Sequence, residues 1–264
     1  MAHTVPPIPY VSAHGLLAGR SVLITAAAGA GIGFAAAKRC LEEGARGLVL
    51  SDMHPRRTPE AAEKLAAEFP QTQVLHKLCN VTQEADVEAL VDFAEEQLGG
   101  VDVLINNAGL GGTRLVVDMT DEEWLKVIDV TLNGTFRMTR AMLRRMQPRG
   151  RGAIVNNASV LGWRAQKEQA HYAAAKAGVM ALTRCAGLEA AEYGVRVNAV
   201  SPSIVFHDFL RKSAPQELLE KLSEREAFHR GAEAWEVANV MVFLASDYAS
   251  YLVGEVISTS SQRA

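Results

Sequence analysis

Short apolar runs alternate with amphipathic stretches along the chain, at a spacing of roughly 25 to 30 residues. Strands joined by helices in this way form a parallel, doubly wound sheet with helices on both faces. We therefore predict an α/β fold in one domain over residues 16–264, after a flexible proline-containing arm at residues 1–15. The expected strands span residues 21–25, 47–50, 73–79, 101–105, 153–155, 195–197 and 254–258. The expected helices span residues 34–43, 59–69, 82–98, 120–146, 172–193 and 234–245, with Thr82 and Thr120 as N-caps.

A glycine-rich turn, TAAAGAGIG at residues 25–33, connects the first expected strand to the first expected helix. Gly29, Gly31 and Gly33 allow the backbone to approach a pyrophosphate, and the helix N-terminus supplies N–H groups and a positive dipole. Asp52 follows the second expected strand, 19 positions after Gly33. A carboxylate at about this distance binds the adenosine ribose hydroxyls in dinucleotide-binding folds. The pattern predicts a Rossmann-type cofactor site.

The charge of Asp52 favours NAD over NADP, because a carboxylate at the ribose repels a 2′-phosphate. No Arg or Lys lies within the glycine-rich turn, which agrees with NAD. Arg56 and Arg57 follow closely, and they are either solvated loop residues or cations that weaken this preference.

Three polar residues form a second candidate site. Tyr172 and Lys176 lie one helical turn apart on the same face of an expected helix. Ser159 follows the expected strand at 153–155. A nearby cation favours the phenolate of a tyrosine, and a serine hydroxyl can hold a substrate oxygen. These are the groups of a proton-transfer site acting on an alcohol or ketone oxygen.

The composition excludes several other classes of protein. The net charge of −3 argues against nucleic acid and anionic membranes as partners. The histidines and cysteines lack metal-ligand spacing, so we expect no metal site, and Cys40, Cys79 and Cys185 are expected to be reduced in a cytoplasmic protein. The sequence shows no apolar run of about 18 residues and no secretory signal pattern.

Taken together, these motifs resemble the short-chain dehydrogenase/reductase family over residues 16–257. The similarity rests on the glycine-rich turn, on Asn-Asn-Ala-Gly at 106–109, on Ser159 with Tyr172-x-x-x-Lys176, and on Asn-Ala-Val-Ser-Pro at 198–202. It implies that Tyr172 is the general acid/base, that Lys176 lowers its pKa and binds the nicotinamide ribose, and that Ser159 holds the substrate oxygen. Asn106 is expected on the adenosine-ribose side. The expected cofactor contacts are Thr25, Gly29, Gly31, Ile32, Gly33, Asp52, Asn80, Val81, Asn107, Ala108, Gly109, Tyr172, Lys176, Pro202 and Ile204.

The chain departs from the family pattern at several positions. Ala26 follows Thr25 where the family has Gly, and the turn is one residue longer. Thr131 replaces an Asn that supports the catalytic Lys, and Asn133 lies on another side of the helix. His207 replaces a Thr and is either a surface residue or a contact of the carboxamide or substrate. His171 is expected to be structural.

A closer resemblance is to an actinobacterial subgroup that acts in sterol and cholesterol catabolism, carried by residues 25–33, 156–166 and 201–204. It implies NAD-dependent hydride transfer at a ring hydroxyl of a steroid-derived bicyclic acyl-CoA thioester. The substrate is expected under a lid at residues 205–230, and helices 120–146 and 172–193 are expected to form a homodimer or homotetramer. The expected apolar wall consists of Trp163, Phe206, Phe209 and Leu210. The expected CoA phosphate contacts are Arg164, Lys167, Arg211 and Lys212.

Two other functions remain open from the sequence. A 3-oxoacyl-thioester reductase of fatty-acid metabolism would usually use NADPH, which Asp52 opposes. A non-catalytic nucleotide-binding scaffold would fit the loss of Asn at 131 and the unusual glycine-rich turn.

Overall fold

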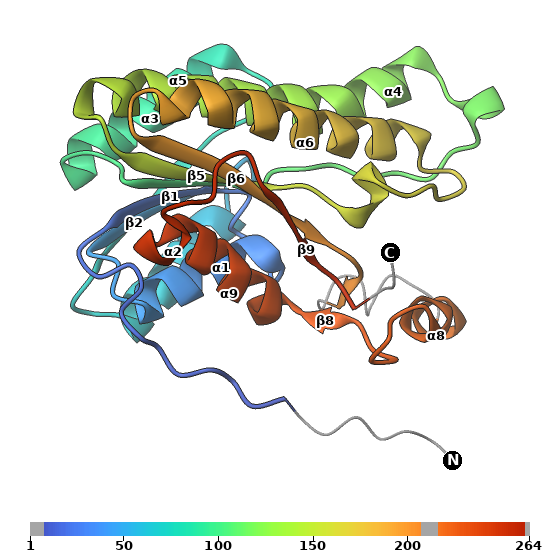
Figure 1. Cartoon of the computed structure of the whole chain (residues 1–264), viewed down its shortest axis with the longest axis horizontal. Coiled ribbons are helices and arrows are strands. Elements are labelled where there is room, and N and C mark those ends of the chain that lie inside the picture. The colour runs from blue at the N-terminus through green and yellow to red at the C-terminus, as the bar shows by residue number, and fades with distance from the viewer. Residues whose placement is uncertain (1–7, 207–215, 262–264) are drawn as a thin grey trace.

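The computed structural model describes residues 8–206 and 216–261. Seven parallel strands form one sheet in the order β3-β2-β1-β4-β5-β6-β9 (Figure 1). The doubly wound parallel sheet predicted from the sequence is therefore confirmed. The strands of this sheet are β1 (Ser21–Thr25), β2 (Gly47–Asp52), β3 (Gln73–Leu78), β4 (Val103–Asn106), β5 (Gly152–Asn157), β6 (Val195–Pro202) and β9 (Val256–Thr259). A separate two-stranded pair joins β7 (Val205–Phe206) to β8 (Ala232–Glu233).

Helices cover both faces of the sheet. Figure 1 shows α1, α2 and α9 below the sheet and α3, α4, α5 and α6 above it, with α8 beside it. The α-helices are α1 (Ile32–Glu42), α2 (Arg57–Glu68), α3 (Glu84–Leu98), α4 (Asp121–Ile128), α5 (Gly134–Met146), α6 (Ala170–Ala191), α8 (Gln216–Glu224) and α9 (Ala234–Ala245). No helix in the described ranges is long and apolar enough to cross a membrane.

Alternating side chains of the central strands build two separate cores. Val22 and Ile24 of β1 pack into the core below the sheet, whereas Leu23 packs into the core above it. β4 repeats the pattern, because Leu104 packs above the sheet and its two neighbours pack below. Strands buried on both faces need apolar residues at successive positions, which explains the continuous Val/Leu/Ile runs in the sequence.

The region above the sheet differs from the prediction of one long helix at 120–146. Thr120 does cap α4, and its capping box with Glu123 is present as expected. A π-helical turn at Asp129–Asn133 then separates α4 from α5. Thr82 is not an N-cap, because its hydroxyl donates to Asn80 Oδ1 and Gln83 occupies the cap position of α3. The sequence pattern gives no sign of either feature.

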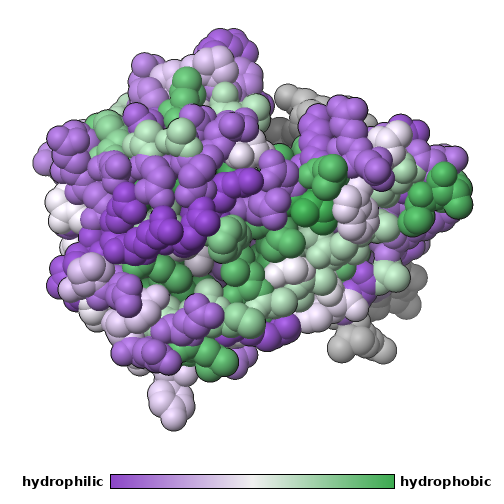
Figure 2. Space-filling model, turned by 90° about the horizontal axis from the view of Figure 1, so that it is seen from above, coloured by the Kyte–Doolittle hydropathy of each residue, from purple (hydrophilic) through white to green (hydrophobic). Residues whose placement is uncertain are grey.

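The outer face formed by α4, α5 and α6 carries exposed apolar residues. Trp124, Leu125, Phe136 and Leu188 are all exposed on these helices. Figure 2 looks down on this side of the molecule and shows a band of hydrophobic residues between strongly hydrophilic regions.

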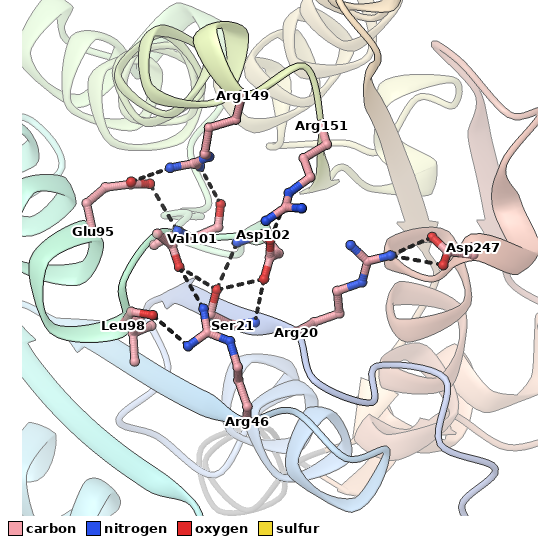
Figure 3. Close-up of polar contacts among 11 residues, drawn as sticks. Arg20, Ser21, Arg46, Glu95, Leu98, Val101, Asp102, Arg149, Arg151 and Asp247 are labelled. Carbon is pink, nitrogen blue, oxygen red and sulfur yellow. Dashed lines mark hydrogen bonds and ion pairs between the residues drawn. The ribbon is translucent and has the colours of Figure 1, made fainter.

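The amino ends of the strands are closed by polar side chains that bond to one another and to the backbone (Figure 3). Ser21 Oγ donates to the Gly100 carbonyl at 2.6 Å, and Asp102 accepts hydrogen bonds from Ser21 N and Oγ at 3.0 Å. Arg149 pairs with Glu95 and donates to the Val101 carbonyl. We refer to this end of the sheet as the amino edge and to the opposite end as the carboxyl edge.

The order of strands reverses between β1 and β4, which places a topological switch point at the carboxyl edge of the sheet. Ligands of doubly wound folds bind at such a point. The ends of β1, β2, β4, β5 and β6 all meet along this edge, as the strand registers require.

The expected N-terminal arm and the expected substrate lid are each described in part. Residues 8–15 lie against α1, where Arg39 donates to the Val11 and Ser12 carbonyls and the Tyr10 ring lies 5.1 Å from the Trp235 ring. The expected lid contains β7 and α8. His207, Phe209, Leu210, Arg211 and Lys212, all named from the sequence, lie outside the described residues.

Candidate active site

The glycine-rich turn runs from the end of β1 into the N-terminus of α1. A Cβ atom added to Gly31 would meet no heavy atom within 4 Å, and one added to Gly29 would reach only the Gly31 nitrogen at 4.0 Å. Protein packing therefore does not require glycine at these two positions. A Cβ on Gly33 would approach the Ala26 carbonyl oxygen at 2.4 Å, so Gly33 is needed for packing. The open space above Gly29 and Gly31, at a helix N-terminus, suits a pyrophosphate.

Ala26 occupies a left-handed backbone conformation with φ of 52°. This conformation is unfavourable for residues with a Cβ and normally selects glycine. The side chain of Asn107 donates to the Ala26 carbonyl at 3.0 Å and so holds the turn in this shape. The turn therefore keeps a left-handed residue directly after Thr25 although the chain has no glycine there.

A cavity of about 670 Å³, which we call the strand-end cavity, opens at the ends of β1, β2 and β4. Asp52 lies in its wall, as expected for a carboxylate at an adenosine ribose, and accepts from His54 N at 3.2 Å. Its lining residues are Thr25, Ala26, Ser51, Asp52, Met53, Arg57, Cys79, Asn80, Val81, Thr82, Ala108, Gly109, Leu110, Lys126, Asp129 and Val130. Six predicted cofactor contacts thus lie together: Thr25, Asp52, Asn80, Val81, Ala108 and Gly109.

Several lining residues were missed from the sequence. Lys126 and Asp129 come from α4 and the π-turn, which lie far along the chain from Asp52, and no local pattern marks them. Arg57, by contrast, was named from the sequence as either a solvated loop residue or a cation that weakens the NAD preference, and it starts α2 and lines the cavity with Asp52. Cys79 also lines the cavity, and burial raises the pKa of its thiol to about 12, which keeps it protonated.

Ser159, Tyr172 and Lys176 come together near the end of β5. Ser159 lies close enough to Tyr172 for its hydroxyl to lower the pKa of the phenol. The Lys176 Nζ donates to the Asn157 carbonyl and lies 5.6 Å from the centre of the Tyr172 ring. The three groups therefore have the arrangement that proton transfer to or from a substrate oxygen requires. Their catalytic roles remain predictions.

Burial shifts the pKa values of this site. It raises the pKa of Tyr172, and the Ser159 hydroxyl opposes that rise only in part. It lowers the pKa of Lys176 to about 8, because an ammonium loses hydration in the interior. Burial therefore has the largest effect on the pKa of Tyr172. The lowering of this pKa by Lys176 stays a prediction.

Two asparagines and a threonine hold the strand ends in register. Thr25 Oγ1 accepts hydrogen bonds from the backbone N–H groups of Asn107 and Ala108 at 3.0 and 3.1 Å. The Asn107 side chain accepts from Asn157 Nδ2 at 2.9 Å. Asn106 was expected on the adenosine-ribose side, but its side chain is buried and donates to Thr139 and Asn156. Asn106 is therefore structural, because β4 directs it toward α5 and β5.

The remaining predicted residues lie at the same edge. Ile32 begins α1, Pro202 ends β6, and the Ile204 carbonyl accepts from Ala232 N at 2.9 Å. His171 is buried, and a Cβ on Gly112 would lie 3.0 Å from its Nε2, in agreement with a packing role. Trp163 and Lys167 are exposed at the loop before α6. Within the described residues, no group of three His, Cys, Asp or Glu side chains could hold a metal ion.

Comparison with known proteins agrees with this geometry. The family described as enoyl-(acyl carrier protein) reductase matches residues 26–260. The (5R,7aS)-5-hydroxy-7a-methyl-1-oxo-2,3,5,6,7,7a-hexahydro-1H-indene-carboxyl-CoA reductase of Mycobacterium tuberculosis is 60% identical over 254 residues, which cover 96% of each chain.

Solved structures show the same fold over almost the whole chain. A short-chain dehydrogenase from Mycobacterium smegmatis has a TM-score of 0.86 and 53% identity, and the match covers 97% of this chain and 98% of that one. An NAD⁺-bound xylitol dehydrogenase has a TM-score of 0.87 and 28% identity, with 93% and 99% covered. This chain belongs to the short-chain dehydrogenase/reductase family and is an oxidoreductase that acts on CH–OH groups.

Proposed function

We propose that the chain transfers a hydride between NAD and a ring hydroxyl of a steroid-derived bicyclic acyl-CoA thioester. The placement of Ser159 and of buried Lys176 beside Tyr172 carries the chemical part of this proposal. The 60% identity to the hydroxy-indene-carboxyl-CoA reductase supports the substrate. We propose that the protein works in the cytoplasm.

The protein groups act on the substrate oxygen. In the oxidation direction, Ser159 holds the alcohol oxygen and Tyr172 Oη takes its proton. A nicotinamide held in the cofactor site would supply the hydride chemistry at the carbinol carbon, and the protein would position the two. The pKa of Lys176, about 8, leaves it mostly protonated at neutral pH, so it is a cation next to the phenol in the working range. Because burial raises the pKa of Tyr172, oxidation is expected to accelerate as the pH rises above neutral.

The strand-end cavity and the glycine-rich turn would hold the cofactor. Asp52 would accept hydrogen bonds from the adenosine ribose, and the N–H groups at the start of α1 would face the pyrophosphate. Asp52 favours NAD, whereas Arg57 and Lys126 line the same cavity and oppose part of that effect. We expect NAD to be preferred, because a 2′-phosphate would meet the Asp52 carboxylate directly.

The main test measures the formation of reduced cofactor with two substrates, a hydroxy-indene-carboxyl-CoA thioester and its free acid. Each substrate is tested with NAD⁺ and with NADP⁺. We expect turnover of the thioester with NAD⁺, and Asp52→Asn to raise the relative use of NADP⁺ about tenfold, which corresponds to about 1.4 kcal/mol. Preference for NADPH and a linear 3-oxoacyl thioester would favour the fatty-acid reductase instead. Cofactor binding without turnover of any alcohol or ketone would favour a scaffold.

We also propose that a second copy of this chain covers the apolar face of α4, α5 and α6, giving a homodimer or homotetramer. The exposed residues on this face and the hydrophobic band in Figure 2 support this assembly. A monomeric mass of 28.5 kDa in light scattering at micromolar concentration would contradict it.

A further inference from the structure

The π-turn at Asp129–Asn133 contacts three parts of the site with consecutive residues. Asp129 and Val130 line the strand-end cavity. Thr131 bonds to Leu110 in the loop after β4, and Leu132 packs on α6. Single π-turns inside helical regions are frequent at functional sites. The turn thus connects the cofactor side of the site to the helix that carries Tyr172 and Lys176.

The hydroxyl of Thr131 makes two hydrogen bonds to one residue. The Leu110 N–H donates to Thr131 Oγ1 at 3.0 Å, and Thr131 Oγ1 donates to the Leu110 carbonyl at 3.2 Å. Thr131 is completely buried. A hydroxyl has one donor and two lone pairs, so one side chain satisfies both backbone groups of Leu110. A valine of the same shape would satisfy neither.

The residue before Leu110 lies against Lys176. A Cβ added to Gly109 would be 3.4 Å from Lys176 Nζ and 3.8 Å from both Oγ1 and Cγ2 of Thr131. Gly109 therefore lies close to both the Thr131 side chain and the ammonium. On its other side, Lys176 donates to the Asn157 carbonyl at the end of β5. The ammonium is enclosed between the ends of two strands.

We infer that Thr131 is a positioning residue that fixes the Gly109–Leu110 backbone against Lys176 and so holds the ammonium in place beside Tyr172. This inference rests on the proposed hydride-transfer function. Thr131 acts through the loop and touches neither substrate nor the reacting atoms.

Protonation of Lys176 provides a readout of this role. Burial alone accounts for its pKa of about 8, and the facing groups are the Tyr172 phenol on α6, the Asn157 carbonyl on β5 and the Gly109 backbone. If the loop loosens and water reaches the ammonium, this pKa moves up toward its ordinary value of 10.5. A residue that only stabilised the fold would leave it unchanged.

The π-turn offers a matched control. Thr135 is also a buried threonine, and its hydroxyl donates to the Thr131 carbonyl at 2.8 Å. Thr135→Val removes a hydrogen bond of the same kind one helical turn away but leaves the bonds to Leu110 intact. Thr131→Ser keeps the hydroxyl, whereas Thr131→Val removes it without changing the shape.

The experiment compares kcat, KM and the pH dependence of reduced-cofactor binding for the wild type and these three variants between pH 6 and pH 11. We expect Thr131→Val to lower kcat at least about tenfold, since small displacements of catalytic groups have effects of this size, with KM within about twofold. We expect the pH midpoint of reduced-cofactor binding to be higher in Thr131→Val than in the wild type. Thr131→Ser and Thr135→Val should stay within about threefold of the wild type, because the contact with Leu110 persists.

Equal losses in Thr131→Val and Thr131→Ser, or an unchanged pH midpoint in Thr131→Val, would overturn the inference. Thr131→Ala removes the same two bonds and replaces the valine variant if that one does not fold. Absence of turnover in the wild type contradicts the proposed function instead, and the binding midpoint then still tests Thr131.

Discussion

The two edges of the sheet are built from the same strands but differ in whether their polar side chains have hydrogen-bond partners. At the amino edge, the Ser21 hydroxyl bonds to Asp102, and Ser21 and Arg149 donate to backbone carbonyls (Figure 3). At the carboxyl edge, Asn157 Oδ1 and Ser201 Oγ are buried without a partner among the described residues. One edge is closed by the protein itself, and the other leaves polar atoms and open glycines where a cofactor and a substrate would bind.

This contrast separates groups that serve stability from groups that serve function. Buried polar groups are normally hydrogen-bonded, and exceptions indicate strain or function. The titratable groups whose burial matters for chemistry, Tyr172 and Lys176, also lie at the carboxyl edge. We therefore expect substitutions at the carboxyl edge to change turnover and substitutions at the amino edge to change stability.

Tyr172→Phe is expected to give the largest effect. It removes the only phenol in the Ser159–Tyr172–Lys176 set and leaves the ring packing intact. General acid–base catalysis contributes roughly 10² to 10⁴ in rate, so we expect kcat to fall about 10³-fold. Steady-state kinetics measure this loss. The melting temperature should stay within about 2 °C, since the ring that packs is unchanged.

The outcome also tests the catalytic assignment. If Tyr172→Phe retains more than about a tenth of the wild-type rate, another group moves the proton. Unchanged binding of reduced cofactor, followed by fluorescence, shows that the variant remains folded and competent to bind.

Arg196→Met tests the opposite edge. The Arg196 guanidinium donates to four carbonyls at the end of α9 and the turn after it, those of Leu244, Ala245, Ser246 and Ala249. A cation at a helix C-terminus also interacts favourably with the helix dipole. Loss of the guanidinium leaves these carbonyls without their donor. We therefore expect the free energy of unfolding to fall by about 2 kcal/mol and the melting temperature to fall by about 4 to 8 °C. Calorimetry measures the shift, and kcat/KM should stay within about twofold.

Arg151→Met is the matched control, because Arg151 is exposed and its ion pair is a long one, with 3.8 Å between Arg151 Nε and Asp102 Oδ1. Such a surface pair contributes at most about 1 kcal/mol. A fall in kcat/KM with Arg196→Met but not with Arg151→Met would show that the amino edge also affects catalysis and that the two edges do not differ in this respect.

Local signals made part of this structure predictable. The glycine-rich turn, Asp52 and the Tyr172–Lys176 spacing depend on residues close in sequence or at fixed offsets, and the strand-helix alternation determined the sheet. The π-turn was not predictable, because residues 129–133 contain no glycine or proline that would mark a break in the helix. Contacts with Leu110 and α6, which lie elsewhere in the chain, accompany the turn. Lys126 reaches the strand-end cavity through tertiary packing, and no pattern near Asp52 marks it.

Ala26→Gly is expected to give the smallest effect. It tests whether backbone strain differs between the two edges of the sheet. At the amino edge, left-handed positions such as Gly99, Gly100 and Gly194 are glycines, whereas Ala26 at the carboxyl edge has φ of 52° with a Cβ. Glycine relieves about 1 kcal/mol of strain but adds freedom to the unfolded chain, which offsets most of that gain. We therefore expect the free energy of unfolding to change by less than about 1 kcal/mol and the cofactor KM by less than about twofold. Denaturant unfolding checks this, and a loss of several kcal/mol would mean that the Ala26 methyl group, rather than the Asn107 hydrogen bond, holds the turn in place.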